Sequence, residues 1–410
     1  MGKFSPVAVA PRYMAAFRCV GDACPDNCCT GWKVDIDKPT YQRYRSVKIE
    51  PLASLLHTHV QRSDDASRAY AEMRMRSDTS CPMLDAHKLC QIQGQLGAEA
   101  LSRTCTDYPR QYSRDGAQLQ VRATLSCPEA ARLALADPQA LDPIELALDF
   151  ANEQRVPIHA RREAPPADAD VVRQHGALLG EVVASVVRTE GLSAVQSLVV
   201  VGLMLRRVAR QGADLDPAAL AQAVEQFCSP ESIQRAPALV AGLPVSKPMQ
   251  LDLLLSTTQR YVATQPVLPA FRRLLDEVWQ GLHGPQGWDV AAERLAAIDA
   301  TQFQAFEQAH PHVLKNYLLN ELGYALFPRK GVAELEREFM ALAVKFALVK
   351  LYACGLMGLR GEAFGSDDMV RVVYVVARSI THNRRFMPEL LETLAQHDAL
   401  SLDVLATLIL

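Results

Sequence analysis

Hydrophobic and polar positions follow different patterns in the two parts of the chain. Beyond about position 170, apolar residues recur three or four positions apart, as in "PHVLKNYLLNELGYALFP", where Leu314, Leu318 and Leu322 share one helical face. "VAELEREFMALAVKFALVKLYACGLMG" predicts a longer helix that is mostly apolar past Phe339 and therefore central. No fixed-period repeat accompanies these helices, so we expect a compact all-α bundle rather than a solenoid.

The first third of the chain predicts shorter elements. "GWKVDID" alternates like a short strand, with Trp32 among its apolar, core-facing positions. "KPTYQRY" predicts a helix that begins near Pro39, and "SCPEAARLALA" predicts another with Ser126 as its cap. "CPMLDAHKLC" predicts two extended pieces around a turn, which would bring Cys81 and Cys90 together.

A proline-rich stretch separates these two patterns. Residues 136–170 carry five prolines and many charges, a composition typical of a connecting segment. We therefore predict a mainly α protein in three parts. These are a cysteine-rich metal-binding module with short strands and helices over residues 1–140, a linker over 141–170 and an all-α helical bundle domain over 171–410.

Length and charge narrow the class of protein. The 410 residues suffice for two domains, and the formal net charge of −3 provides no overall basic field for nucleic acid. The N-terminus has no apolar core of signal-peptide length, and the longest apolar run, "LVVVGLML", is too short to cross a membrane. We therefore expect a cytoplasmic protein with neither a nucleic-acid nor a membrane partner.

Cysteines are concentrated in the first third of the chain, which packing alone would not produce. Eight of the ten lie there: Cys19, Cys24, Cys28, Cys29, Cys81, Cys90, Cys105 and Cys127. In a reducing compartment such a group is more typical of metal binding than of disulfides.

Three states of these cysteines are compatible with the sequence. Thiolates from separated loops can hold a four-iron cluster. Four thiolates also suit structural zinc, although the usual C-x2-C knuckles do not occur. The third state is reduced thiols packed as small hydrophobes. Because adjacent side chains diverge, Cys28 and Cys29 are not expected to face one iron centre equally well, so either one of them packs or two centres form.

Three stretches of the first third carry a resemblance to a known family. "PRYMAAFRCVGDACPDNCCTGWKVDIDKPTYQRY", "CPMLDAHKLCQIQGQLGAEALSRTCTDYPRQY" and "LSCPEAARL" together resemble the flagellin lysine-N-methylase family. "KNYLLNELGYALFP" in the helical half is similar as well. The resemblance implies methyl transfer from S-adenosylmethionine to lysine side chains of flagellin, with a [4Fe-4S] cluster held by the N-terminal cysteines.

Methylation of lysine requires a neutral amine, whereas the ε-ammonium group has a reference pKa of about 10.4. A base or a desolvating site is therefore needed. Candidates near the cysteines are Tyr108, Asp107 and Asp37, together with Asp35. Each has a structural alternative, because the two earlier aspartates alternate with apolar residues like the solvated face of a strand, and the tyrosine can pack beside its cysteine loop.

The sequence assigns no residues to the methyl donor. The Gly-rich turn of dinucleotide-type sites is missing, and the glycines of "GLMGLRGEAFG" are more typical of a helix end than of a ligand cradle. The alternative function is a non-catalytic iron–sulfur or zinc-binding module with a helical protein-interaction domain. The protein partner expected from the resemblance is flagellin, and the oligomeric state is left open.

Overall fold

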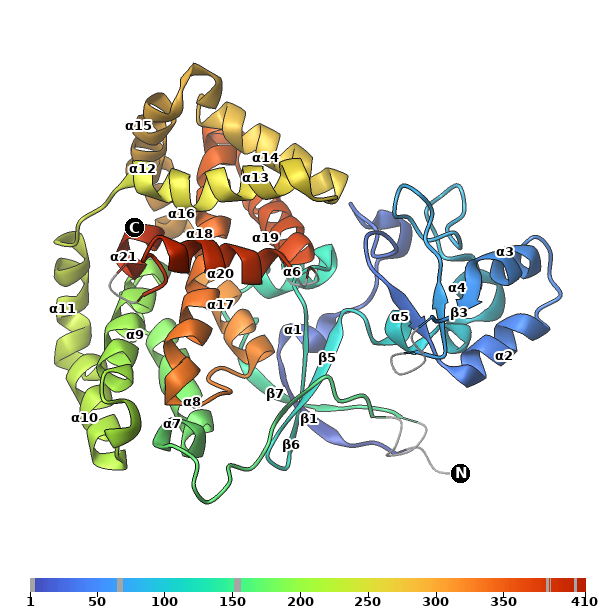
Figure 1. The fold of residues 1–410 in the computed structure, drawn as a ribbon, viewed down its shortest axis with the longest axis horizontal. Coiled ribbons are helices and arrows are strands. Elements are labelled where there is room, and N and C mark those ends of the chain that lie inside the picture. Colours follow the sequence, from blue (N-terminus) through green and yellow to red (C-terminus); the bar gives the residue numbers. More distant parts are fainter. Residues whose placement is uncertain (1–3, 65–68, 151–155, 381–382, 384, 402–403) are drawn as a thin grey trace.

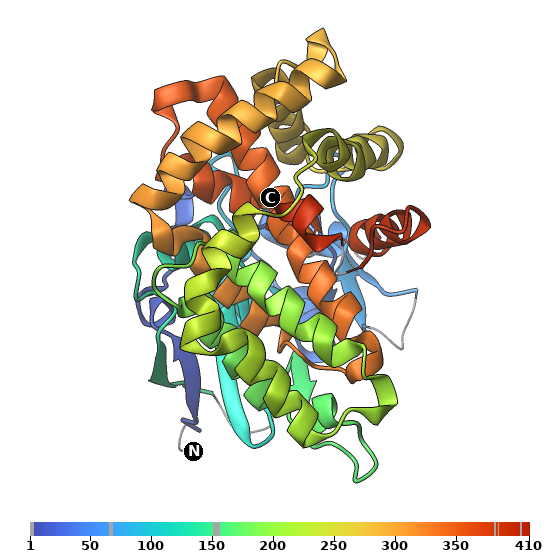
Figure 2. The same cartoon turned by 90° about the vertical axis from the view of Figure 1, so that its left-hand side faces the viewer.

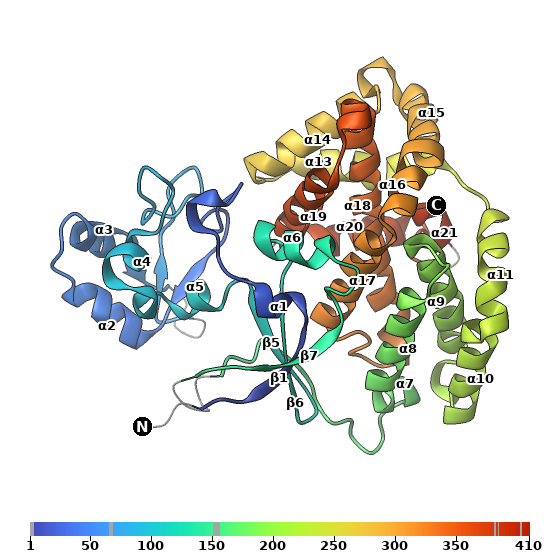
Figure 3. The same ribbon diagram turned by 180° about the vertical axis from the view of Figure 1, so that it is seen from behind.

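The protein has a small lobe that stands beside a larger helical body. The computed structural model describes residues 4–64, 69–150, 156–380, 383, 385–401 and 404–410. In Figure 1 the blue lobe, which contains most of the early cysteines, projects to one side, while the green-to-red helices form the body on the other. A sheet lies between the two parts, and Figure 3 gives the same arrangement from behind.

The sheet has five strands in the order β7-β1-β6-β5-β8. Its strands are β1 (Val7–Pro11), β5 (Arg110–Asp115), β6 (Gln118–Ala123), β7 (Pro143–Ala147) and β8 (Ala160–Arg162). Strand β6 pairs antiparallel with β5 and parallel with β1, and β7 pairs antiparallel with β1. The stretch expected as a linker, residues 141–170, thus supplies both edge strands of this sheet, because its short extended runs find backbone partners on β1 and β5.

Helices dominate the rest of the body and amount to 61% of the structure, which confirms the expected mainly α class. The longer ones are α6 (Pro128–Ala136), α8 (Gly176–Arg188), α9 (Ala194–Ala209), α10 (Pro217–Cys228), α11 (Pro230–Ala241), α13 (Thr257–Thr264), α14 (Pro269–Gly281), α15 (Trp288–Ile298), α17 (Pro311–Ala325), α18 (Val332–Arg360), α19 (Ser366–Ile380) and α20 (Phe386–Gln396). Figure 2 views the body from the side on which the green helices face the reader.

Helix α18 is the central element of the body, as its apolar sequence predicts. It packs against α9, α14, α15, α19 and the short C-terminal helix α21 (Leu405–Ile409). Within the described residues, the stretch Val332–Ala363 is long and apolar enough to cross a membrane, but 89% of its most apolar part is buried inside the protein. Its composition therefore fits the core helix that it is in this fold.

Helix α17 joins the body to the N-terminal sheet. Asn316 and Asn320, which lie between its leucines, are buried rather than solvated, because their side chains form hydrogen bonds with residues among the first 140. Asn316 Nδ2 donates to the carbonyl oxygen of Ala134 at 2.9 Å, and Asn320 Oδ1 accepts from the Tyr13 hydroxyl at 2.9 Å. The five-stranded sheet and the helices consequently share one continuous hydrophobic core.

The lobe has a separate, smaller core. Its elements are β2 (Val34–Ile36), α2 (Lys38–Ser46), α3 (Leu52–His59), β3 (Val60–Arg62), β4 (Ala71–Met73), α4 (Gln91–Leu96) and α5 (Arg103–Asp107), with the sheet order β2-β4-β3. The predicted turn after Cys81 is confirmed, because Leu84 and Cys90 pair as an isolated bridge and Asp85 accepts from two N–H groups of the turn.

Two local predictions differ from the structure. Trp32, expected in a core, is half-buried and lies outside β2, where it lines an open groove. The cap of α6 is Cys127 rather than Ser126, whose hydroxyl is fully buried and contacts Tyr108 instead. In both cases a tertiary partner, which local periodicity cannot indicate, determines the position of the side chain.

Candidate active site and cysteine centre

A groove of about 1410 Å³ runs between the lobe and the five-stranded sheet. All three catalytic candidates, Asp37, Asp107 and Tyr108, line it, and so does Asp35. Its wall combines carboxylates, guanidinium groups and aromatic rings, which suits an extended peptide that carries a cationic side chain. The groove is therefore the candidate active site.

Asp107 is a carboxylate of the groove that two neighbouring side chains hold in place. It ends α5, and its Oδ2 lies 3.4 Å from His159 Nε2 and 3.5 Å from Arg103 Nε. The other ring nitrogen of the histidine, Nδ1, accepts from the backbone N–H of Tyr112 at 3.0 Å, so Nε2 carries the proton that faces the carboxylate. These contacts orient Asp107 and leave its second oxygen available to accept a proton.

His159 was not among the residues singled out in the sequence. It lies just before β8, far from Asp107 along the chain, and reaches the groove because β8 pairs with β5. The surrounding "VPIHA" contains no motif that would have marked it, so only the strand pairing identifies this residue.

Asp37 has a structural role at the start of α2. Its Oδ1 accepts from the backbone N–H of Thr40 at 2.8 Å, which is the geometry of a helix N-cap. Of the three catalytic candidates, Asp37 is therefore the one whose carboxylate already serves as a helix cap.

Tyr108 and Trp32 form an aromatic wall of the groove. Their ring centroids lie 4.7 Å apart at an interplanar angle of 61°. Burial raises the pKa of Tyr108 well above its ordinary value, and the hydroxyl lies 3.2 Å from that of Ser126. A phenol in this environment stays protonated, so Tyr108 provides a surface and a hydrogen-bonding group rather than a base.

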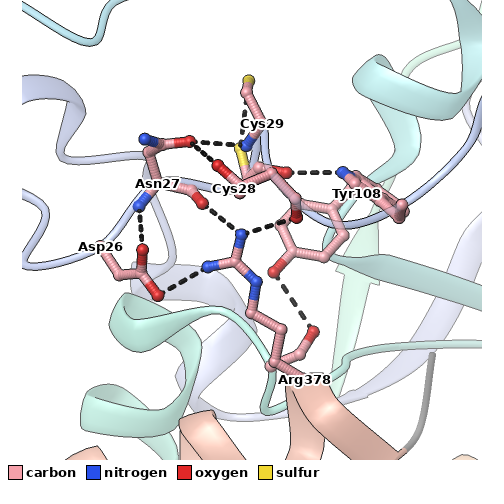
Figure 4. A network of polar contacts seen from close by, with 9 residues as sticks. Asp26, Asn27, Cys28, Cys29, Tyr108 and Arg378 are labelled. Carbon is pink, nitrogen blue, oxygen red and sulfur yellow. Dashed lines mark hydrogen bonds and ion pairs between the residues drawn. The ribbon is translucent and has the colours of Figure 1, made fainter. Parts of the chain in front are cut away.

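The double-cysteine loop is held by an arginine from the helical body (Figure 4). Arg378 of α19 is buried, and its Nη1 contacts Asp26 Oδ2 at 2.7 Å. Its Nη2 donates to the carbonyl oxygens of Asn27 and, at 2.9 Å, Thr30. Its position within the apolar run "VVYVVARSI" was a sequence signal for a buried arginine that needs a partner.

Four of the eight candidate cysteines line the core of the lobe. Cys81 is buried there, and Cys29, Cys90 and Cys105 pack against the same residues. The backbone N–H of Cys81 donates to the carbonyl of Cys29 at 2.8 Å, which joins two of their loops. Burial raises the pKa of Cys81 to about 11 and that of Cys105 to about 12, so these thiols are neutral unless a metal takes their protons.

Of the other four cysteines, Cys28 lines a small cavity with Tyr108 and Arg378, and Cys127 packs against the core of the body. Cys19 is exposed and Cys24 is half-buried. None of the ten cysteines of the chain is in a disulfide. Among the described residues, no three His, Cys, Asp or Glu side chains converge closely enough to surround a single metal ion.

Two glycines of the stretch "GLMGLRGEAFG" lie within the last turns of α18 and are packed against α14. A Cβ atom on Gly358 would lie 2.3 Å from the carbonyl oxygen of Gly281, and one on Gly355 would lie 2.6 Å from Val278. These glycines allow α14 and α18 to approach closely. These two glycines therefore have a packing function, and α18 ends at Arg360 with Gly361 as its C-cap, as the helix-end interpretation predicts.

Known proteins resemble this chain along almost its whole length. The C-terminal domain of the FliB lysine N-methylase family matches residues 181–408, more than half of the chain. Proteins named Lysine-N-methylase from Salmonella typhimurium (strain LT2) and Salmonella choleraesuis (strain SC-B67) are each 25% identical over 411 residues, which cover 97% of this chain and 98% of the relative.

A second kind of relative matches a shorter part of the chain. The flagellar biosynthetic protein FliU of Salmonella muenchen is 33% identical over 132 residues, which cover 32% of this chain and 78% of FliU. No solved structure matches the chain significantly. Together, the family match and these relatives show that the chain belongs to the FliB lysine N-methylase family and is a protein-lysine methyltransferase.

Proposed function

We propose that the protein transfers a methyl group from S-adenosylmethionine to lysine side chains of flagellin, in the groove between the lobe and the sheet. The observation that carries this proposal is the oriented carboxylate of Asp107, which opens onto a groove wide enough for a peptide. The flagellar name of one relative supports flagellin as the substrate. The reaction would take place in the cytoplasm, where thiols remain reduced.

Asp107 is the proposed proton acceptor. The ε-ammonium group must lose a proton before its nitrogen has a lone pair with which to attack, and the Asp107 carboxylate is placed to accept that proton. The neutral nitrogen then attacks the methyl carbon: a C–N bond forms, the S–CH₃ bond breaks and the sulfonium becomes a neutral thioether. His159 and Arg103 keep this carboxylate in place, so they are positioning residues.

The aromatic wall and the carboxylates also suit the donor. A sulfonium carries a positive charge, which is attracted by the faces of aromatic rings and by nearby acidic groups. Trp32 and Tyr108 present their rings to the groove that Asp107 enters. The wall would hold the methyl group close to the acidic side of the groove while it excludes water from the reacting atoms.

The lobe cysteines Cys29, Cys81, Cys90 and Cys105 are proposed to hold a [4Fe-4S] cluster. They are four thiols around one small core, which matches the number of ligands that such a cluster takes. A bound cluster would supply a redox-active iron centre in the lobe. Its thiolates would also tie the loops of the lobe together.

The test is a methylation assay with purified flagellin and S-adenosylmethionine, with methyl-lysine measured by mass spectrometry. Asp107→Asn keeps the shape of the side chain but removes its basicity, so kcat should fall by about 100-fold or more. Asp142→Asn is the matched control, because Asp142 is exposed and forms an ion pair with Arg12 away from the groove. The control should methylate at the wild-type rate.

Two results would contradict the proposal. Methylation by Asp107→Asn at the wild-type rate would remove the proposed base. A wild-type protein that is loaded with iron and binds the donor, yet leaves every flagellin lysine unmodified, would remove flagellin as substrate and favour a non-catalytic module.

A further inference from the structure

Strand β5 has an outer edge that its neighbour β8 covers only in part. The pairing of β8 with β5 begins at Ser113, whose partner is Ala160. Just before it, the backbone N–H of His159 donates to the carbonyl oxygen of Tyr112 at 2.8 Å. The Tyr112 N–H donates in turn to Nδ1 of the His159 ring at 3.0 Å, where a regular ladder would offer it a carbonyl oxygen. The ladder between the two strands therefore ends at Tyr112, and Arg110 lies beyond it.

The backbone of Arg110 faces this outer edge rather than β6. Its partner in register on β6 is Ala123. The Ala123 N–H donates to the Tyr13 hydroxyl at 2.9 Å, and the Ala123 carbonyl oxygen accepts from Asn320 Nδ2 at 3.1 Å. Both backbone groups of Ala123 are thus turned away from β5, as in a pair of an antiparallel ladder that exchanges no hydrogen bonds. The N–H and C=O of Arg110 consequently point to the side on which β8 lies.

The segment before β8 cannot continue the ladder to Arg110. Two positions before His159, the N–H that would reach the Arg110 carbonyl oxygen belongs to residue 157, which is a proline and has no N–H. Among the residues that the structure describes, no other backbone hydrogen bond to this carbonyl oxygen is present. Arg110, Gln111 and Pro157 line the groove, as His159 does, so the open edge faces the candidate active site.

Two side chains at the open edge suit a bound substrate. Gln111 Oε1 is buried and has no hydrogen-bond partner among the described residues, although the side chain lines the groove. A buried oxygen without a donor is costly, so a bound chain that donates to it is favoured. His159, where the ladder ends, also lies 3.4 Å from Asp107. A segment that lies along this edge therefore brings its lysine next to the proposed proton acceptor.

We propose that the substrate lysine is carried on an extended protein segment that adds to β5 as a further strand, at Arg110 and in line with β8. The segment donates a backbone N–H to the Arg110 carbonyl oxygen and accepts from the Arg110 N–H, and its side chains alternate between the walls of the groove. This inference rests on the proposed function, because it takes the groove as the place where lysine reacts. It also sets the class of substrate: a lysine in a helix, whose backbone groups are already paired, reacts only after its segment unfolds.

Peptide binding to anaerobically purified, full-length protein tests the inference, with fluorescence anisotropy as the readout and no methyl donor present. The probes are peptides of about ten residues, the length of a long strand, each centred on one lysine of flagellin. Methylation of a single backbone nitrogen of the peptide removes one donor and leaves every side chain in place. Because alternate residues of a strand face the same edge, the Kd should rise about fivefold or more at every second position and stay unchanged at the positions between.

Two measurements on the protein complete the test. Gln111→Ala removes the buried acceptor, so the Kd should rise about fivefold. Gln118→Ala is the matched control, because Gln118 is exposed on β6 and does not line the groove, and its Kd should equal that of the wild type. Hydrogen exchange at the Arg110 N–H should slow when peptide binds, whereas exchange at Val121 on the inner strand β6 should not change.

Three results would overturn the inference. They are equal effects of backbone methylation at adjacent positions, tighter binding by a peptide that a side-chain cross-link holds helical, and no binding by any of the peptides. Failure of the proposed function looks different, because peptides that bind with the alternating pattern but are never methylated refute the reaction and retain the mode of binding. Methylation of flagellin by a protein that shows no alternating pattern refutes only the added strand.

Discussion

The lobe and the helical body differ in the size of the apolar core that stabilises them. The body builds one core that runs from the five-stranded sheet through α17 to α18. The lobe has strands of only three residues and a core of thirteen buried residues. A core of that size buries little apolar surface, so small domains of this kind usually need disulfides or metals. The lobe has free thiols in place of disulfides.

The body can even accommodate charges in its interior. Lys247 and Lys350 both contact the carboxylate of the buried Asp299, the latter at 3.0 Å. Burial lowers the pKa of Lys247, which reflects the cost of keeping its charge away from water. The burial of a large apolar core can offset such a cost, whereas the small core of the lobe buries too little apolar surface to do so. From this difference we predict that the lobe, unlike the body, depends for its stability on a metal held by its thiols.

Removal of metal is expected to have the largest effect on the difference in stability between the lobe and the body. Anaerobic chelation of iron should cost the lobe most of its stability, which for a small domain is on the order of 5–15 kcal/mol, since metal binding and folding are coupled. Hydrogen exchange should then lose protection at Val34–Ile36 and Ala71–Met73. Helix α18 is the internal control and should keep its protection. Equal protection of the lobe with and without iron would mean that its apolar core suffices.

Substitution of Arg378 should have a moderate effect, confined to the contact between the two regions. Arg378→Gln removes charge-assisted hydrogen bonds to Asp26 and to the loop carbonyls, which should cost about 2 kcal/mol. We expect faster hydrogen exchange at residues 26–30. Arg371→Gln, on the same helix, breaks an ion pair with Glu277 inside the body and should leave that loop unchanged. Equal exchange of the loop in both variants would show that Arg378 does not hold it.

The smallest expected effect concerns the cap of α2 within the lobe. Asp37→Ala should lower the free energy of unfolding by about 1 kcal/mol, whereas Asp37→Asn, which still caps, should stay near the wild-type value. Chemical denaturation measures the difference. Both variants should methylate normally once folded, because this carboxylate serves the helix end. A loss of methylation in both, at unchanged stability, would instead return Asp37 to the reaction.

The helices of the body were predictable because each one buries a repeating face. The 3.6-residue period of α17 and the apolar length of α18 are local properties, so they can be recognised from the sequence without tertiary information. The edge strands β7 and β8 were missed because they are short and rich in charge or proline, and only their pairing with β1 and β5 makes them strands. Strand pairing depends on residues that are far apart in the chain, so the hydrophobic period within one segment does not predict it.

The residues of the candidate site were likewise predictable only in part. Asp107 and Tyr108 stood out as an acidic and a phenolic group beside a cysteine, and both line the groove. His159 and Arg378 come from segments that are distant along the chain. Only the tertiary structure brings them into contact with Asp107 and Asp26. No pattern in a single segment encodes which side chain will meet a carboxylate from another.

The sequence by itself determined the class of the protein, its cysteine content and the likeness to lysine methylases, because residue types and their spacing are properties of the chain. Only the tertiary structure decided how those cysteines group. Cys28 and Cys29 are neighbours in the chain, yet one contacts the lobe core and the other borders the helical body. The reason is physical: which neighbours a thiol meets depends on how loops from distant positions pack, and that packing is set by the whole fold.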